Sequence, residues 1–562
     1  MTPTPANSAF SPAFVADALV VVLGRTHSLR YWAETGTLDR ELALYRALAA
    51  GYRKMFLVTS AGDEDQKLAD RAGFNAEIVA LDHTDGASLT RAVDRIAPGI
   101  TSATVVTDDL LAGQTPISIA SRLRMAGVQT AVIARGASIP SRFFAHDPGG
   151  DSRQAADAAA LETRLLSCCD LVIGTTESMV DDLCWRNSIN ASRSAVVPGH
   201  VLTPRELSET PREKNRILFC GPLISRKRVD ILLRAVSLLP EPLSREVTIE
   251  IIGEGDQGQA LRGLASELGV NAIFQGWISH ARVLESMARC TLYVDASALE
   301  NQPRALLDAM STGAPIVVAD IRGLRDLVQT GVTGIRVQPE PEAFAQTMEG
   351  LLQDEDWRQT LGAGAARFIN TQLTIEHVAP RHLQAHALGH AVARARPNAI
   401  SRLSDIQLLV CDFDGVFTDN RVLTTQEGNE AVFCSRGDGM GLEMLRKSGM
   451  SIFVLSKEQN PVVAARCKKL KLECLQGIDD KLPALQKLAK DRGLAPREIA
   501  YVGNDTNDLG PLSWVGLPVL VADVHPDVLP KLNRADALVL SNEGGKGALR
   551  EFCDLLLSHK PK

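Results

Sequence analysis

The chain of 562 residues has a net charge of −7 and is 45% hydrophobic and 23% charged, so it can bury several cores and is not a disordered polymer. Aromatic residues make up only 4% and there is no long basic run, which argues against nucleic acid as a partner. No apolar run reaches membrane length and no signal-peptide pattern occurs, so we expect no transmembrane segment and at most peripheral membrane contact.

The ten cysteines are scattered, and several, such as Cys220 and Cys411, lie within apolar runs. No C-x-x-C spacing occurs. We interpret them as buried thiols of a reducing compartment rather than as a disulfide framework, and we expect a cytoplasmic location.

From residue 17 to about 200, short β-branched runs alternate with stretches of helical pattern. This alternation predicts an α/β unit with a doubly wound parallel sheet, which binds ligands beyond the carboxyl ends of its strands. The expected strands are Leu19–Leu23, Met55–Thr59, Glu77–Leu81, Ala103–Thr107, Thr130–Ala134, Leu171–Gly174 and Ala195–Val197. The helix opened by Thr35–Glu41 either offers backbone N–H groups to an anion or is a capped surface helix.

A charged linker with two prolines, Thr203–Asn215, separates this unit from a second α/β unit that begins at Arg216–Gly221. Helical pattern extends from Pro341 to about Ala395, and Arg396–Asn398 then predicts another linker. A third α/β unit covers Asp405–Leu557. We therefore predict domains at residues 1–205, 214–395 and 404–562.

The second unit contains basic and acidic residues in positions that suit a diphosphate ligand. Gly221 follows a strand and leaves room for a phosphate, and the adjacent Arg226 and Lys227 would neutralise it. Glu300 and Asp308 bracket a stretch that runs into a helix, whose N-terminus would favour a negatively charged leaving group. The alternative for the basic residues is an ordinary solvated face.

These segments resemble the family-4 glycosyltransferases of GT-B fold, which have two Rossmann-like domains. The resemblance lies in Gly221–Ala235, Ile251–Gly255, Phe274–Trp277, Ser297–Pro315 and Thr333–Ile335. It implies retaining, metal-independent transfer from a nucleotide sugar, with no cofactor beyond this donor. It also implies that the first unit binds the acceptor.

The same resemblance assigns roles to individual residues. Arg226 and Lys227 would hold the donor diphosphate near Gly221, Glu300 would lie near the donor sugar, and Asp308 would contact the ribose. Two positions differ from the family pattern: Pro222 stands where an arginine is usual, and Asp308 where a glutamate is usual. A proline cannot donate a hydrogen bond to phosphate.

In the third unit, the apolar run Leu408–Cys411 leads directly into Asp412 and Asp414. Residues i and i+2 of a strand share a face, so both carboxylates would address one point, where Mg²⁺ would offset their repulsion. Ser456 ends another expected strand, Lys481 starts a helix, and Asn504, Asp505 and Asp508 follow a further strand. Acids, hydroxyl, lysine and acids in this order predict phosphoryl transfer to a carboxylate.

Asp405–Leu557 resembles the haloacid-dehalogenase-like phosphatases, a Rossmannoid fold, and among them the capless 3-deoxy-octulosonate-8-phosphate phosphatase type. The specific features are Asp412–Asp419, Arg436–Gly441 and Gly544–Glu551. The resemblance implies a tetramer whose subunits share sites, with Arg436 among the substrate-binding residues. Asp412 would be the nucleophile, Asp414 the general acid/base, and Ser456 and Lys481 the phosphoryl ligands.

The resemblance also places Mg²⁺ among Asp412, Asp414 and the acidic cluster Asn504, Asp505 and Asp508. Asn504 occupies a position where the family has an aspartate, so we expect weaker metal binding.

Together the two resemblances imply a fusion of a glycosyltransferase with a phosphatase that acts on a 2-keto-3-deoxy sugar acid phosphate of eight or nine carbons, in surface glycan synthesis. Its small-molecule partners would be a nucleotide sugar and a sugar phosphate. Two alternatives stay open: the third unit is mainly an oligomerisation module, or both units act in turn on one phosphorylated acceptor.

Overall fold

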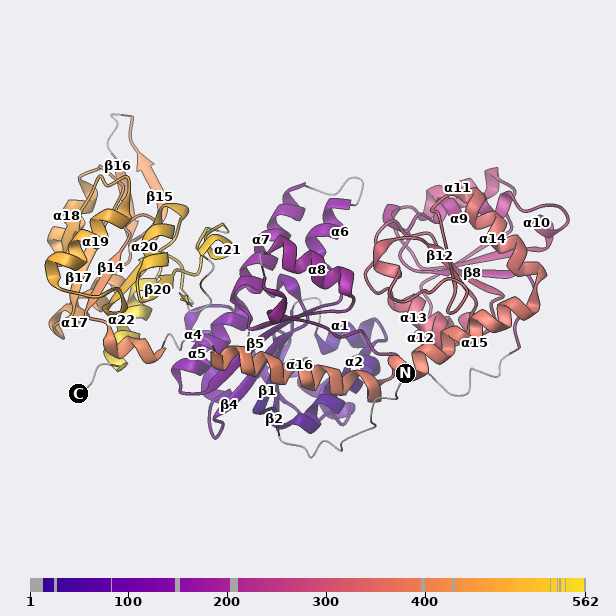
Figure 1. Cartoon of the computed structure of the whole chain (residues 1–562), viewed down its shortest axis with the longest axis horizontal. Coiled ribbons are helices and arrows are strands. Elements are labelled where there is room, and N and C mark those ends of the chain that lie inside the picture. The colour runs from indigo at the N-terminus through magenta and orange to yellow at the C-terminus, as the bar shows by residue number, and fades with distance from the viewer. Residues whose placement is uncertain are drawn as a thin grey trace, which may run out of the picture.

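The computed structural model describes residues 14–24, 28–81, 83–146, 152–187, 189–202, 211–395, 400–426, 430–525, 527–532, 534, 537–540 and 542–559. Three parallel sheets follow one another along the chain, each belonging to one α/β unit. The units lie in a row, with the first unit between the third and the second (Figure 1). The expected α/β fold with several Rossmann-like sheets is confirmed.

The first unit has a seven-stranded parallel sheet in the order β3-β2-β1-β4-β5-β6-β7. Its strands are β1 (Ala16–Val22), β2 (Tyr52–Thr59), β3 (Glu77–Ala80), β4 (Ser102–Thr107), β5 (Gln129–Gly136), β6 (Leu171–Gly174) and β7 (Ser194–Val196). Its helices are α1 (Leu29–Glu34), α2 (Leu38–Leu48), α3 (Gly62–Arg71), α4 (Gly86–Ile96), α5 (Thr115–Met125), α6 (Pro140–His146), α7 (Ser152–Cys168) and α8 (Glu177–Arg186). All seven strands expected from the sequence are present.

Strand β1, in the interior of this sheet, is apolar on both faces because helices cover both faces. Ala18 and Val20 of β1 pack into one core cluster, while Leu19 and Val21 pack into another. Successive side chains of a strand point to opposite faces, so a strand buried on both sides becomes a continuous apolar run.

The second unit has a six-stranded parallel sheet in the order β10-β9-β8-β11-β12-β13. Its strands are β8 (Arg216–Cys220), β9 (Thr248–Ile252), β10 (Ala272–Gly276), β11 (Leu292–Asp295), β12 (Ile316–Ala319) and β13 (Ile335–Val337). Its helices are α9 (Val229–Ser237), α10 (Leu243–Glu246), α11 (Gly258–Glu267), α12 (His280–Arg289), α13 (Arg304–Ser311), α14 (Pro341–Gln353) and α15 (Glu355–Gln372).

A long helix, α16 (Ile375–Ala395), leaves the second unit and returns to the first, where it packs on β5, β6 and α2 (Figure 1). Val378, Ala379 and Ala385 belong to a core cluster of the first unit. The helix therefore ties the two units together after the chain has already crossed between them.

The third unit has a six-stranded parallel sheet in the order β18-β17-β14-β19-β20-β21 and an antiparallel hairpin, β15-β16. Its strands are β14 (Leu408–Cys411), β15 (Thr418–Thr424), β16 (Glu430–Cys434), β17 (Ser451–Leu455), β18 (Glu473–Leu475), β19 (Ile499–Gly503), β20 (Leu517–Leu520) and β21 (Leu538–Val539). Its helices are α17 (Arg436–Lys447), α18 (Val462–Leu470), α19 (Lys481–Arg492), α20 (Leu509–Trp514), α21 (Val528–Leu532) and α22 (Ala548–His559).

The predicted linker Arg396–Asn398 and most of the linker Thr203–Asn215 lie outside the described residues. The three domain boundaries stay predictions. Within the described part of the chain, no helix combines the length and the hydropathy that crossing a membrane requires.

Candidate functional sites

In the second unit, the loop after β8 brings two cations to one carboxylate. Lys227 Nζ lies 2.6 Å from Glu300 Oε1, and Arg226 Nη1 lies 2.7 Å from the same oxygen. All three side chains are at least nine-tenths buried. Burial opposes the charge of Lys227, but Asp295 and Glu300 outweigh burial and raise the pKa of the ammonium group.

Close backbone contacts hold this site together. A Cβ on Gly323 would lie 1.8 Å from the carbonyl oxygen of Glu300, so only glycine fits there. Asp308, on α13, accepts a hydrogen bond from His280 Nε2 at 2.9 Å when that nitrogen carries the proton. Gly221, Arg226, Lys227, Glu300 and Asp308 are thus collected at the carboxyl ends of the strands.

The first unit closes over this group of residues. The guanidinium carbon of Arg226 lies 4.4 Å from the ring centre of Phe143, on α6. Arg304, at the start of α13, pairs with Glu41 of α2 at 2.7 Å. The group therefore lies between the two units, where α/β proteins of this kind bind ligands.

In the third unit, Lys481 bridges two acids at the carboxyl ends of neighbouring strands. Its Nζ lies 2.7 Å from Asp412 Oδ1, after β14, and 2.8 Å from Asp508 Oδ1, beyond β19. Lys481 is 1% exposed and Asp412 is 4% exposed. An ammonium buried this deeply requires paired charges, and here it fixes the distance between two loops.

Asp508 is held on both sides. Tyr501 donates its hydroxyl to Oδ1 at 2.6 Å, and the backbone N–H of Asn504 donates to Oδ2 at 2.9 Å. Asp508 thus supports both the lysine and the turn that carries Asn504. Its assignment as a direct metal ligand stays a prediction.

Asn504 presents a side-chain oxygen with no partner among the described residues. Its Oδ1 is buried and accepts no hydrogen bond from them. Gly415 (φ 73°) packs so closely that a Cβ there would lie 1.9 Å from Asn504 Nδ2. The glycine after Asp414 is therefore needed for the acids and the amide to come together.

Three further predicted residues, Ser456, Asp505 and Arg436, differ in how deeply they are buried. Ser456 is fully buried at the end of β17, and its hydroxyl accepts the backbone N–H of Glu458 at 3.0 Å. Asp505 is half-buried and its carboxylate accepts the N–H of Thr506 within its own turn. Arg436, the first residue of α17, is exposed.

Comparisons with known proteins match both parts of the chain. The family model described as "Glycosyl transferases group 1" matches residues 204–368. A 3-deoxy-D-manno-octulosonate 8-phosphate phosphatase (KdsC) of Yersinia pestis is 34% identical over 166 residues, 29% of this chain and 87% of the relative. That of Escherichia coli K12 is 37% identical over 161 residues, 28% of this chain and 84% of the relative.

The chain belongs to the KdsC-type phosphatases, fused to a group 1 glycosyltransferase. A crystal structure of the phosphatase from Moraxella catarrhalis, in complex with magnesium, phosphate and KDO, is 30% identical and covers 29% of this chain and 91% of its own, with a TM-score of 0.27. The predicted fusion of a glycosyltransferase with a haloacid-dehalogenase-like phosphatase is confirmed. Homology supports a transferase activity and a phosphatase activity.

The phosphatase site carries an excess of negative charge that a cation would offset. Burial raises the pKa of Asp412 to about 8, the nearby Asp508 adds to the rise, and Lys481 opposes it. Burial, followed by Glu458, raises the pKa of Asp414 as well. Since a nucleophilic carboxylate must be ionised, one lysine does not suffice near neutral pH.

These residues fit a hard cation such as Mg²⁺. Asp412 and the partnerless Oδ1 of Asn504 are the oxygen donors that this ion prefers. No cluster of three or more His, Cys, Asp or Glu side chains suited to a metal is found in the described ranges, which agrees with an amide in place of a carboxylate.

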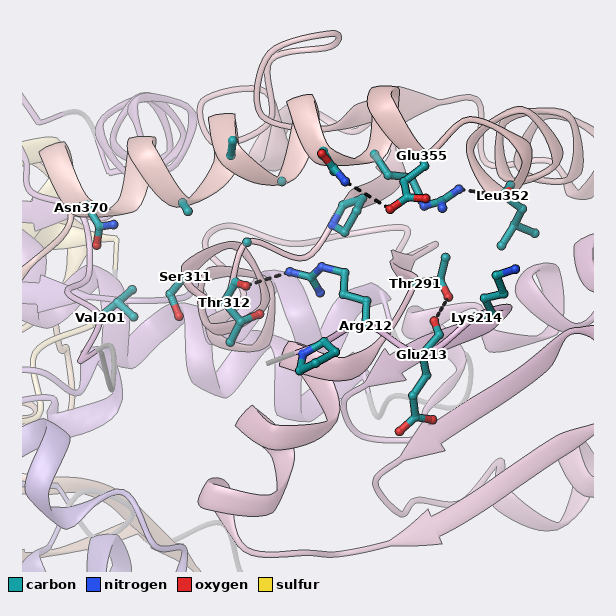
Figure 2. A pocket seen from close by; sticks show the side chains of 18 of the residues that line it. Val201, Arg212, Glu213, Lys214, Thr291, Ser311, Thr312, Leu352, Glu355 and Asn370 are labelled. Carbon is teal, nitrogen blue, oxygen red and sulfur yellow. Dashed lines mark hydrogen bonds between the residues drawn. The ribbon is translucent and has the colours of Figure 1, made fainter. Parts of the chain in front are cut away.

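The second unit also has a large cavity, which is separate from the predicted donor site (Figure 2). Its volume is about 1800 Å³. Its lining includes Asn215, Thr291 and Pro315, which directly precede β8, β11 and β12 respectively. Arg212 donates to Thr312 O in its wall at 2.8 Å. The cavity therefore lies at the amino ends of the strands, opposite the predicted donor site, and contains none of the predicted site residues.

Sequence reasoning missed four side chains that complete the two sites. Asp295 lies 3.6 Å from Lys227, and His280, Phe143 and Tyr501 contact Asp308, Arg226 and Asp508 respectively. Asp295 is the last residue of β11 and Tyr501 lies within β19, so their position in apolar strands was an available signal. Phe143 comes from the other unit, and no local pattern indicated it.

Proposed function

We propose that the third unit hydrolyses a 2-keto-3-deoxy sugar acid phosphate, octulosonate 8-phosphate or nonulosonate 9-phosphate, in a Mg²⁺-dependent reaction. The names of the relatives support this substrate class, and the site chemistry supports the metal. This reaction would serve the biosynthesis of surface glycans such as lipopolysaccharide or capsule.

In this reaction Asp412 Oδ attacks phosphorus, the bond from phosphorus to the sugar oxygen breaks, and Asp414 protonates the leaving oxygen. Water then attacks the aspartyl-phosphate, with Asp414 taking its proton, and releases phosphate and Asp412. Lys481 and Ser456 bind the phosphoryl oxygens. Mg²⁺, bound by Asp412, the Asp414 carbonyl and Asn504, with Asp505 and Asp508 nearby, would supply further positive charge.

We further propose that the first two units transfer a sugar from a nucleotide donor with retention and without a metal. Arg226 and Lys227 now pair with Glu300, and the donor diphosphate would take over these cations near Gly221. Glu300 would then face the donor sugar and Asp308 the ribose. The acceptor would bind to the first unit.

A cytoplasmic homo-oligomer, a tetramer through the phosphatase unit, fits this function. On the hairpin β15-β16 and on α17, four apolar residues are each more than half exposed: Val422, Leu423, Phe433 and Met440. Such a patch favours contact with another subunit, whose Arg436 would reach the shared site.

The observation that carries the phosphatase proposal is the buried pairing of Asp412 with Lys481 at 2.7 Å. The test is a phosphate-release screen of the full chain over sugar phosphates with Mg²⁺. We expect release from an eight- or nine-carbon keto-deoxy acid phosphate, and loss of at least about 1000-fold in Asp412→Asn, because an amide is not a nucleophile here. Release by Asp412→Asn at the wild-type rate would exclude this mechanism.

A further inference from the structure

The phosphatase unit packs against the first unit of the glycosyltransferase. Helix α21 contacts α7, and strand β21 contacts α5 (Figure 1). Met125, at the end of α5, and Cys168, at the end of α7, pack against the apolar core of the phosphatase unit. The core of one enzyme is thus completed by side chains of the other.

Polar contacts join the same surfaces. Arg164 Nη2, on α7, donates to the backbone carbonyl of Val524 at 3.3 Å. Gln114 Nε2, on the residue before α5, donates to the carbonyl of Leu540 at 3.4 Å. Both acceptors lie in segments that follow strands of the phosphatase sheet, β20 and β21.

The other side of the first segment forms part of the phosphatase site. The N–H of His525, the residue after Val524, donates to the carbonyl of Asn504 at 2.8 Å. Asp523 accepts the N–H of Gly544 at 2.8 Å, and a Cβ on Gly544 would lie 1.9 Å from the carbonyl of Gly415. Residues 521–525 therefore lie between α7 and the loops that carry Asp414 and Asn504.

We propose that the glycosyltransferase unit is a structural support of the phosphatase site, and that Arg164 is a positioning residue that acts through residues 521–525 on Asn504. This rests on the proposed Mg²⁺-dependent phosphatase. Second-sphere contacts of this type orient metal ligands, and their removal typically weakens metal binding about 10- to 100-fold. Arg164 acts through one more contact, so we expect about 3- to 10-fold.

The experiment titrates the full chain with Mg²⁺ by calorimetry, without substrate. The heat that Asp412→Asn abolishes defines binding at this site. We expect the Mg²⁺ Kd to rise about 3- to 10-fold in Arg164→Ala and to return toward wild type in Arg164→Lys, which keeps a donor for Val524. Arg142→Ala, which removes an ion pair to Asp182 in the same unit, is the matched control and leaves the Kd unchanged.

A second readout is the Mg²⁺ concentration for half-maximal phosphate release, which we expect to shift by the same factor. If Arg164→Ala does not fold, Met125→Ser weakens the packing of the same interface between the first unit and the phosphatase unit without removing a hydrogen bond. An unchanged Kd in the folded variant overturns the proposal. A wild-type chain that binds Mg²⁺ but releases no phosphate overturns the phosphatase function instead, and the shift in Kd still decides the positioning role.

Discussion

Lys227 of the second unit and Lys481 of the third unit are both buried lysines that pair with two carboxylates. Each lysine residue is at most 5% exposed, and its ammonium lies between two carboxylates: Glu300 and Asp295 for Lys227, and Asp412 and Asp508 for Lys481. Burying a cation costs free energy unless its charge is paired, so the acids hold the lysines in place before substrate binds. In the proposed mechanisms Asp295 and Asp508 are supports, while Glu300 and Asp412 would act on the substrates.

Lys227 is expected to be required for glycosyl transfer. Lys227→Ala removes the charge that would face the diphosphate and should lower the transfer rate roughly 30- to 1000-fold, while a chelator leaves transfer unchanged. The measurement is sugar transfer from a panel of nucleotide sugars, with Arg228→Ala as the control. Arg228 is adjacent, but its side chain is 42% exposed and pairs with Asp230. Transfer that a chelator abolishes and Lys227→Ala does not affect would refute this role.

Asn504 is expected to limit the affinity of the phosphatase site for Mg²⁺. Asn504→Asp adds a carboxylate where a buried amide oxygen has no partner, and should lower the half-activating Mg²⁺ concentration by about 3- to 10-fold. Phosphate release measured against Mg²⁺ concentration checks this. Asn507→Asp adds the same charge on the exposed face of the same turn and serves as the control. A higher requirement for Mg²⁺ in Asn504→Asp would contradict the assignment.

At the scale of elements, α16 presents three buried histidines, one on each successive turn, to the sheet of the first unit. His386 Nδ1 lies 2.7 Å from the Tyr52 hydroxyl, and His390 Nε2 lies 2.9 Å from Thr104 Oγ1. Burial, followed by Arg135, lowers the pKa of His386 to about 3. Burial, followed by Arg394, lowers that of His390 to about 4. The helix is therefore anchored by neutral imidazoles.

This arrangement predicts that the first unit loses stability in mild acid. Below pH 6.5 the unfolded chain binds protons that the buried histidines do not, so stability is fully present above 6.5 and falls as the pH drops toward 4. Each histidine contributes a slope of about 1.4 kcal/mol per pH unit in that window. Melting temperature measured from pH 7.5 to 4.5 checks the sign.

The variant that tests this is His390→Gln, because the glutamine amide can still hydrogen-bond to Thr104 but does not titrate. We expect a shallower decline of melting temperature with falling pH than in the wild type. An equal or steeper decline in the variant would show that α16 does not carry this dependence.

At the scale of the whole molecule, the first unit is the centre of the row and contacts both neighbours. It meets the second unit across the predicted donor site and through α16, and it meets the phosphatase unit through α5 and α7. The linker pattern at Arg396–Asn398 predicts two separable enzymes. Because Met125 and Cys168 of the first unit pack against the core of the phosphatase unit, we expect the two parts to stay associated after the link between them is cut.

A cleavable site inserted between Pro397 and Asn398 tests this. After proteolysis we expect both pieces to co-elute in size-exclusion chromatography, because separation would expose the apolar surface around Met125 to water. Met125→Asp in the same background should favour separation, since it places a charge in that contact. Pieces that elute apart in both backgrounds would show that the contact does not hold the units together.

The sequence by itself determined the elements and the kinds of chemistry. Continuous apolar runs such as Leu408–Cys411 end in functional residues, and in a parallel sheet the strand direction alone brings such residues to one edge. The order of Asp412, Ser456, Lys481 and Asn504 along the chain was therefore enough to predict one site. Gly221, Arg226 and Lys227 after β8, together with Glu300 and Asp308 further along the chain, had the same effect in the second unit.

Only the tertiary structure decided which groups meet across units, because such contacts leave no periodic signal in the chain. Phe143 on Arg226, Glu41 on Arg304 and Arg164 on Val524 join segments from different units. The course of α16 and the docking of the phosphatase unit depend on matching surfaces rather than on local propensity. The partnerless oxygen of Asn504 is likewise a property of packing, since it depends on which neighbours Gly415 allows to approach.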